Sequence, residues 1–214
     1  MTTERDQTVS ERNLPEPEPA VAAAPAADPS LLGLPAFTVG SIALGLTQVG
    51  FLPAAAAGGV LPIILAATGL GLLVATIWAA ALGQSTVAGI FGIFTGFWWS
   101  YAILVLGLGH GWFTVATADA TRVVGLFLLS WTILIAVLTL ATLRLPAAFT
   151  ALLALVTLAP ALETIGTLLP ASALIKVGGV VVLLFAALGV YLFVAASEVA
   201  LGGAGYQLGR PVRR

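Results

Sequence analysis

The stretch VGGVVVLLFAALGVYLFVAAS, residues 177–197, contains no charged side chain and no proline. Lys176 precedes it and Glu198 follows it. A helix needs about 20 predominantly apolar residues to cross the hydrocarbon core of a membrane. Lipid offers the backbone no hydrogen-bond partner, so a spanning segment must be a helix or a strand of a closed barrel, and this run lacks the alternation of a barrel strand. The stretch therefore predicts a transmembrane α-helix.

Most of the chain has the same character. Hydrophobic residues make up 60% of the sequence and charged residues 8%, and the mean hydropathy is +1.11, which is outside the range of soluble globular domains. Glycine, proline and charged residues divide the apolar part into six runs. We therefore predict an all-α integral membrane protein with six transmembrane helices and short loops. The predicted spans are residues 31–52, 60–81, 87–108, 123–143, 147–169 and 174–201.

The two ends of the chain differ from this apolar domain. Residues 1–27 are acidic and rich in Pro and Ala, so burial cannot offset their ordering entropy and we expect a disordered tail. Residues 28–203 would form the membrane domain and residues 204–214 a basic tail. Six spans put both termini on one side, and the excess of arginine there places them in the cytoplasm. On that side lie Arg5, Arg12, Arg144, Arg210, Arg213 and Arg214, against Arg122 and Lys176 on the other.

The composition also excludes several classes of function. The sequence has no cysteine and one histidine, His110, and no cluster of His, Asp and Glu, so we predict neither a metal nor another cofactor. No basic patch indicates a nucleic-acid partner. No catalytic constellation is present, so we do not expect an enzyme.

A polar stripe runs along the first predicted helix. Its members recur at spacings that place them on one helical face, and they are Thr38, Ser41, Gly45 and Gln48. Two interpretations stay open. The hydroxyls bond back to the preceding turn while small side chains admit a neighbouring helix, or the stripe lines a wet path through the membrane.

The third predicted helix carries two different rows of residues. One row consists of Gly89, Gly92 and Gly96, and the other of Phe91, Phe94 and Trp98. Glycines at this spacing allow two helix backbones to approach closely. The aromatic row either faces lipid or narrows a pore to an apolar constriction.

Two acidic residues lie within apolar surroundings, Glu163 and Glu198. A charge at mid-bilayer costs about 2.5–3.5 kcal/mol even on the lenient insertion scale, so we expect both side chains to reach the interface. The alternative is that Glu198 faces an aqueous vestibule and exchanges a proton. Pro160 removes a backbone donor from the fifth predicted helix and should kink it.

The first span opens with DPSLLGL, residues 28–34, where Asp28 as N-cap and Pro29 as first helical residue are ordinary helix-start chemistry. This stretch also resembles NPAPLGL, the opening signature of the acetate uptake transporter family (YaaH/SatP-like succinate/acetate permeases). Three further stretches are similar to that family and extend the resemblance to Arg210. They are GLTQVGF at 45–51, GQSTVAGIFGIFTGFWWS at 83–100, and YLFVAASEVALGGAGYQLGRPVRR at 191–214.

The resemblance implies a six-helix protein that assembles as a hexamer and carries acetate and related small carboxylates through each subunit, usually with proton coupling. It places a hydrophobic constriction at Phe37, Phe94 and Val156. Here phenylalanine replaces the family's tyrosine, and valine replaces its leucine. The implied entrance motif comprises Asp28, Pro29 and Gly33. The pattern of residues itself adds Thr38, Ser41 and Gln48 as a polar lining and Glu198 as the candidate proton site.

Asp28 is the main departure from the family pattern. The motif has asparagine, which donates to a carboxylate, whereas an ionised aspartate only accepts. The function predicted is a plasma-membrane transporter or channel for small carboxylates, with lipid and other copies of the chain as partners. A non-transporting scaffold of the same fold, or a channel for another small solute such as formate, remains an alternative.

Overall fold

The computed structural model describes residues 27–213 and shows six helices long and apolar enough to cross a membrane. The predicted fold class is confirmed. Most of the segment predicted to be a disordered tail lies outside the described residues. The helical elements are α1 Ser30–Gln48, η1 Ala54–Val60, η2 Ile63–Gly69, α2 Leu70–Ala81, α3 Ser85–Gly109, α4 Thr117–Ala141, α5 Ala147–Leu168 and α6 Ser172–Ala200.

Two helices begin earlier than the sequence predicted. The second spanning segment runs from Ala54 to Ala81, because a 3₁₀ turn and a π-helical segment precede α2. Helix α4 begins at Thr117, six residues before its predicted start at 123. Asp119 and Arg122, which marked the edge of the apolar run, are helical and form an exposed i,i+3 ion pair at 3.6 Å. Charge marks the end of the apolar run, but the helix continues beyond it.

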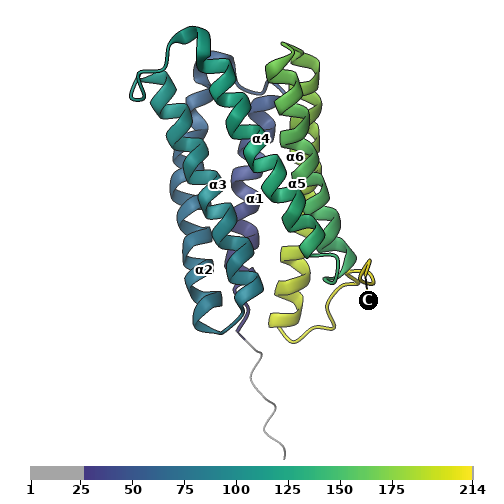
Figure 1. Ribbon diagram of the computed structural model, residues 1–214. Coiled ribbons are helices and arrows are strands. Elements are labelled where there is room, and N and C mark those ends of the chain that lie inside the picture. Colours follow the sequence, from purple (N-terminus) through teal and green to yellow (C-terminus); the bar gives the residue numbers. More distant parts are fainter. Residues whose placement is uncertain (1–26, 214) are drawn as a thin grey trace, which may run out of the picture.

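The helices form one elongated bundle with α1 in its middle (Figure 1). Helix α1 packs against α6 on one side and against η2 and α2 on the other. The start of α1 and the C-terminal segment lie at the same end of the bundle (Figure 1). This agrees with an even number of spans, and the membrane face at which that end lies stays a prediction.

Glycines bring α1 and α6 together. A Cβ atom placed on Gly179 would lie 2.7 Å from Gln48 Cβ, and one placed on Gly189 would lie 2.5 Å from Thr38 Oγ1. On the α1 side, a Cβ atom on Gly45 would lie 2.9 Å from Leu183. The polar stripe of α1 therefore packs in part against α6, as small residues allow in membrane bundles.

A π-helical segment brings the second span against α3. Segment η2 replaces the regular α-helical bonding pattern over Ile63–Gly69. Trp99 Nε1 donates to the Leu65 carbonyl at 3.3 Å, and Gly69 leaves the space that the Trp99 ring fills. An indole N–H from α3 thus binds a backbone oxygen in a region where the helical pattern is disturbed.

The C-terminal segment folds back onto the bundle. The Ala148 amide donates to the Leu208 carbonyl at 2.9 Å, and the Arg213 amide donates to the Leu143 carbonyl at 2.9 Å. The Tyr191 hydroxyl donates to the Gln207 carbonyl at 2.7 Å. The segment is therefore attached beside the turn between α4 and α5.

The two rows of α3 have opposite environments. Gly89 and Gly96 are exposed, whereas a Cβ atom added to Gly92 would lie 3.3 Å from Thr76 Cγ2 of α2, so the middle glycine of the row lies against a second helix. Phe91, Phe94 and Trp98 are all buried in the core, so the interpretation of this row as lipid-facing is wrong. Helix α3 turns its bulky side toward α1.

Candidate functional site

The start of α1 is capped by its own first residues. Asp28 Oδ1 accepts a hydrogen bond from the Ser30 amide at 2.8 Å, and Pro29 is fully buried. This is the helix-start chemistry predicted for these two residues, with the helix boundary shifted by one position. The capped turn fixes the direction in which α1 enters the bundle.

Gly33 allows α3 to approach α1. A Cβ atom added to Gly33 would overlap the ring of Phe91. Both residues are buried, and Phe91 also lines a cavity on this side of the bundle. The glycine of the entrance motif therefore sets the position of an aromatic wall residue.

We expect Gly33→Ala to lower the free energy of unfolding by about 1–3 kcal/mol, because the added methyl group displaces a packed ring. The matched control is Gly89→Ala, where an added Cβ meets nothing within 4 Å. That change should be neutral or stabilising by up to about 1 kcal/mol, since alanine favours helix. Thermal unfolding of both variants in detergent measures the difference. Equal melting temperatures would contradict this role of Gly33.

The larger cavity lies near the start of α1 and has a volume of about 220 Å³. Helices α1, α3 and α5 and the turn before α5 form its walls. The polar side chains among its lining residues belong to Ser30 and Thr86. The lining residues are Ser30, Leu34, Phe37, Thr86, Val87, Ile90, Phe91, Phe94, Leu145, Phe149, Leu152 and Leu153.

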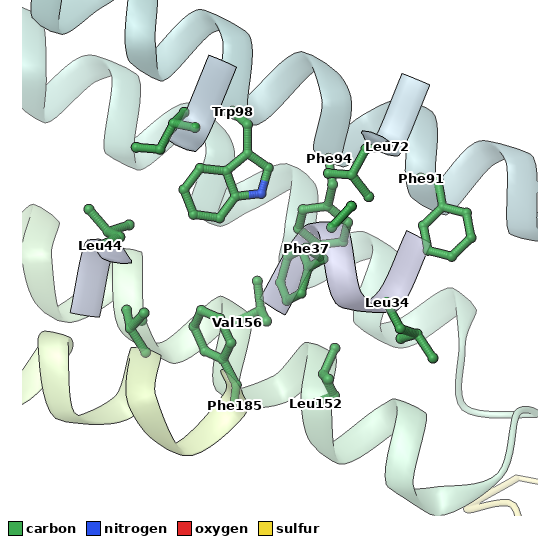
Figure 2. Close-up of a cluster of buried hydrophobic side chains, with 14 of the residues drawn as sticks. Leu34, Phe37, Leu44, Leu72, Phe91, Phe94, Trp98, Leu152, Val156 and Phe185 are labelled. Carbon is green, nitrogen blue, oxygen red and sulfur yellow. The ribbon is translucent and has the colours of Figure 1, made fainter. Parts of the chain in front are cut away.

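Two phenylalanine rings close the inner end of this cavity. Phe37 of α1 and Phe94 of α3 meet edge to face, with ring centroids 5.0 Å apart, and are 5% and 3% exposed. Figure 2 shows the two rings at the centre of the buried cluster, with Phe185 and Trp98 beside them. The ring of Phe37 lies 5.7 Å from that of Phe185 and 6.2 Å from that of Trp98. Aromatic side chains from three helices thus meet at one level of the bundle.

A second, smaller cavity of about 30 Å³ lies beyond these rings. Phe37 and Phe94 line both cavities, so their contact separates the two spaces. Val156 of α5 is 5% exposed and lines the second cavity only. The structure therefore brings the three residues of the implied constriction to the same place. The remaining lining residues are Leu44, Phe97, Trp98, Ile135, Ala159, Pro160, Glu163, Val182 and Phe185.

The second cavity contains polar groups that the sequence did not mark as functional. Glu163 is 9% exposed and lines this cavity, so it does not reach an exposed interface as expected. Gly178 of α6 makes room for it, because a Cβ atom there would lie 3.0 Å from Glu163 Cγ. Trp98 Nε1 is buried and finds no hydrogen-bond partner within residues 27–213. The sequence shows that Glu163 lies in an apolar run, but it does not show that α6 covers this side chain.

The other predicted site residues lie outside the two cavity walls. Ser41 Oγ donates to the Phe37 carbonyl at 2.8 Å, and Thr38 is buried against α6. Gln48 is half-buried, and its Oε1 atom has no partner in the described part of the chain. Glu198 is exposed near the end of α6. A role in transport for these four residues stays a prediction.

The arrangement combines apolar walls with very few polar groups. No lysine, arginine or histidine within residues 27–213 lines either cavity. An anion inside would therefore meet no fixed positive charge, and a hydrated ion would meet an apolar aromatic contact that excludes water. The fold and these cavities define a six-helix membrane bundle with an interior divided by an aromatic constriction.

Residues 13–201 match the GPR1/FUN34/yaaH family, and the chain belongs to this family. The resemblance to the acetate uptake transporters is thereby confirmed. Among solved structures, the fold is similar to that of the bacterial acetate channel SatP, with a TM-score of 0.74 and 22% sequence identity. The similarity covers 83% of this chain and 96% of that one. No curated protein matches significantly.

Proposed function

We propose that the protein is a membrane transporter or channel for acetate and related small carboxylates, with one pathway through each protomer. The observation that carries the proposal is the Phe37–Phe94 contact, which lies between two cavities inside the bundle. Family membership and the fold shared with an acetate channel support it. Substrate would pass the two rings and then Val156.

The chemistry of the walls suits a small, weakly held solute. Without a fixed cation, a carboxylate is bound weakly, and weak binding favours release and flux. The edge-to-face contact leaves no room for a hydrated ion, so passage requires the rings to move apart and the solute to shed water. Larger carboxylates would need a wider opening of the same rings.

We further propose that both termini are cytoplasmic, that the protein lies in the plasma membrane, and that it forms a homohexamer. Arg144 lies in the turn between α4 and α5, to which the C-terminal segment with Arg210 and Arg213 is attached, whereas Arg122 and Lys176 lie near the starts of α4 and α6. This difference supports the orientation. Proton coupling belongs to the same proposal, with Glu198 as one candidate group.

Uptake of labelled acetate into sealed proteoliposomes tests the function. We expect uptake above that of protein-free vesicles, and competition by related small carboxylates. Uptake equal to that of empty vesicles, with correctly oriented protein, would favour the scaffold alternative. Stronger inhibition by formate than by acetate itself would favour the channel for another solute.

The aspartate at the entrance allows a more specific prediction. Asparagine caps a helix as well as aspartate does, so Asp28→Asn should leave stability unchanged. It removes a negative charge two residues before Ser30, which lines the larger cavity. We expect anion flux to rise a few-fold at low salt, and less at high salt because ions screen the charge.

Proteoliposome uptake at two ionic strengths measures this effect. Asp119→Asn is the matched control, since Asp119 is an exposed acid in the first turn of α4, at the other end of that helix from the turn where the C-terminal segment attaches. An Asp28→Asn variant with the same flux as the control at both ionic strengths would show that Asp28 does not repel substrate.

A further inference from the structure

We propose that the second cavity is a carboxyl-binding site, in which Trp98 donates a hydrogen bond to the substrate and the acid form of Glu163 donates another. This inference rests on the proposed function and names the residues that would recognise the substrate. Both side chains line the same cavity and come from different helices, α3 and α5. Neither belongs to the constriction or to the polar stripe.

Trp98 supplies an unused donor. Its side chain is 1% exposed, and Nε1 is buried without a partner in residues 27–213. The indole N–H can only donate, so an acceptor is needed to satisfy it. Figure 2 shows the ring nitrogen on the side of Trp98 that faces Phe37. The adjacent Trp99 has a partner, because its Nε1 donates to the Leu65 carbonyl at 3.3 Å.

An unpaired buried donor is uncommon in folded proteins and calls for a functional or structural explanation. A substrate oxygen that passes Phe37 would enter the cavity that Trp98 lines. A carboxylate is a strong acceptor, and a hydrogen bond to a charged group is stronger than one between neutral groups. The unused N–H is therefore suited to hold a carboxylate without a fixed positive charge.

Glu163 supplies the second group. Its carboxyl group is buried between α5 and α6, next to Gly178. Gln48 of α1 packs against Gly179, the residue that follows Gly178. Tyr101 of α3 stacks on Phe97, which lines the same cavity, with ring centroids 6.4 Å apart. From α4 the wall contributes Ile135, which is apolar.

The charged residues of the surrounding helices are not directed at Glu163. Lys176 of α6 and His110 after α3 are exposed. Asp119 and Arg122 of α4 are also exposed and pair with each other, the one ion pair within the described residues. Besides Glu163, Tyr101 is therefore the titratable side chain of helices α3 to α6, as described, that is not exposed. Within residues 27–213, no lysine, arginine or histidine lines this cavity to offset a negative charge on Glu163.

The two protonation states of Glu163 have opposite effects on an anion. In the acid form, its O–H donates to a carboxylate oxygen of the substrate while Trp98 Nε1–H donates to the same group. In the ionised form, Glu163 has no donor and repels the substrate in a medium of low dielectric constant. Transport should therefore fall as the pH rises through the range in which Glu163 loses its proton.

Trp98→Phe tests the donor, because it removes the N–H and keeps an aromatic ring. We expect KM for acetate to rise about tenfold or more, the usual effect of losing a hydrogen bond to a charged group, with the pH profile unchanged. Trp131→Phe is the matched control, since Trp131 lies on α4 outside both walls and should keep the wild-type KM. Equal KM values for the two variants would overturn this part.

A measurement on the wild-type protein covers the case in which Trp98→Phe does not fold. The protein has five tryptophans, so a ¹⁵N spectrum of the indole groups contains five signals. Saturating acetate should shift the signal that exchanges most slowly with water, because Trp98 is the most buried of these rings. Five signals that stay unchanged would overturn the assignment.

Glu163→Gln tests the acid, because the amide keeps a donor and cannot ionise. We expect acetate exchange, measured at equal pH on both sides of the vesicle and corrected for empty vesicles, to decline with rising pH in the wild type. The decline should be absent in Glu163→Gln and present in Asp119→Asn. An unaltered decline in Glu163→Gln would overturn this part.

Two different outcomes distinguish a failure of the proposed transport function from a failure of the carboxyl-binding site. Wild-type protein that moves no acetate would remove the proposed function itself. Wild-type protein that moves acetate, while Trp98→Phe and Glu163→Gln behave as their controls do, would remove only the carboxyl-binding site.

Discussion

Replacing Phe94 with alanine is expected to join the two cavities and to let larger carboxylates through. Phe94 lines both spaces and touches Phe37 edge to face, so its ring is half of the contact that separates them. The uptake of butyrate relative to acetate should rise about tenfold or more, which is the discrimination that one or two methylene groups provide. Uptake of both labelled acids into proteoliposomes gives this ratio.

The same change should also weaken the fold. Phe94 is 3% exposed, and removal of a buried phenylalanine side chain typically costs about 3–5 kcal/mol. Phe127→Ala is the control, because Phe127 packs against Phe97 on the α4 side and lines neither cavity. It should lose stability without a change in the uptake ratio. If Phe94→Ala keeps the wild-type ratio in folded protein, the two rings do not form the constriction.

The number and type of helices could be predicted from the sequence because the membrane imposes a simple rule. Long apolar runs must be helical in lipid, and glycine, proline and charge divide them. The same rule could not give the helix starts. The π-helical segment over Ile63–Gly69 packs against Trp99 of another helix, a contact that an apolar run does not predict, and α4 extends past its charged first turn.

The candidate site could be predicted only in part. Sequence similarity pointed to Phe37, Phe94 and Val156, which the structure brings together. Helix periodicity alone could not decide whether the aromatic row of α3 faces lipid or lines a pore. The surroundings of Glu163 depend on a glycine in another helix, Gly178, which no pattern within α5 reveals. Helix periodicity defines a face, and only the tertiary contacts show what that face meets.

The partners of the polar stripe of α1 could not be predicted from its spacing either. Its spacing correctly placed Thr38 and Gln48 on one face, but their contacts with Gly189 and Gly179 come from the far end of the sequence. The small residues of α6 let α1 pack closely. Phe37 of α1 therefore meets Phe185 of α6, with ring centroids 5.7 Å apart, so the contact between these two helices positions one side of the constriction.

Val156→Phe is expected to block the pathway that Phe94→Ala opens. Val156 is 5% exposed and lines the second cavity, so a phenyl ring at this position would fill the space that a passing solute needs. Overpacking a core site costs about 1–3 kcal/mol. If this packing free energy adds to the free-energy barrier for passage of the solute, flux falls about tenfold or more, since 1.4 kcal/mol in a barrier corresponds to a factor of ten.

Val137→Phe is the matched control, because Val137 of α4 is 59% exposed and a larger side chain there meets no packed neighbour. Acetate uptake by Val137→Phe should equal that of the wild type. Equal protein content, together with melting temperatures above the assay temperature in both samples, would show that the loss in Val156→Phe is not a loss of folded protein. Wild-type flux through a folded Val156→Phe variant would place the route elsewhere, since a solute that never passes Val156 does not respond to its size.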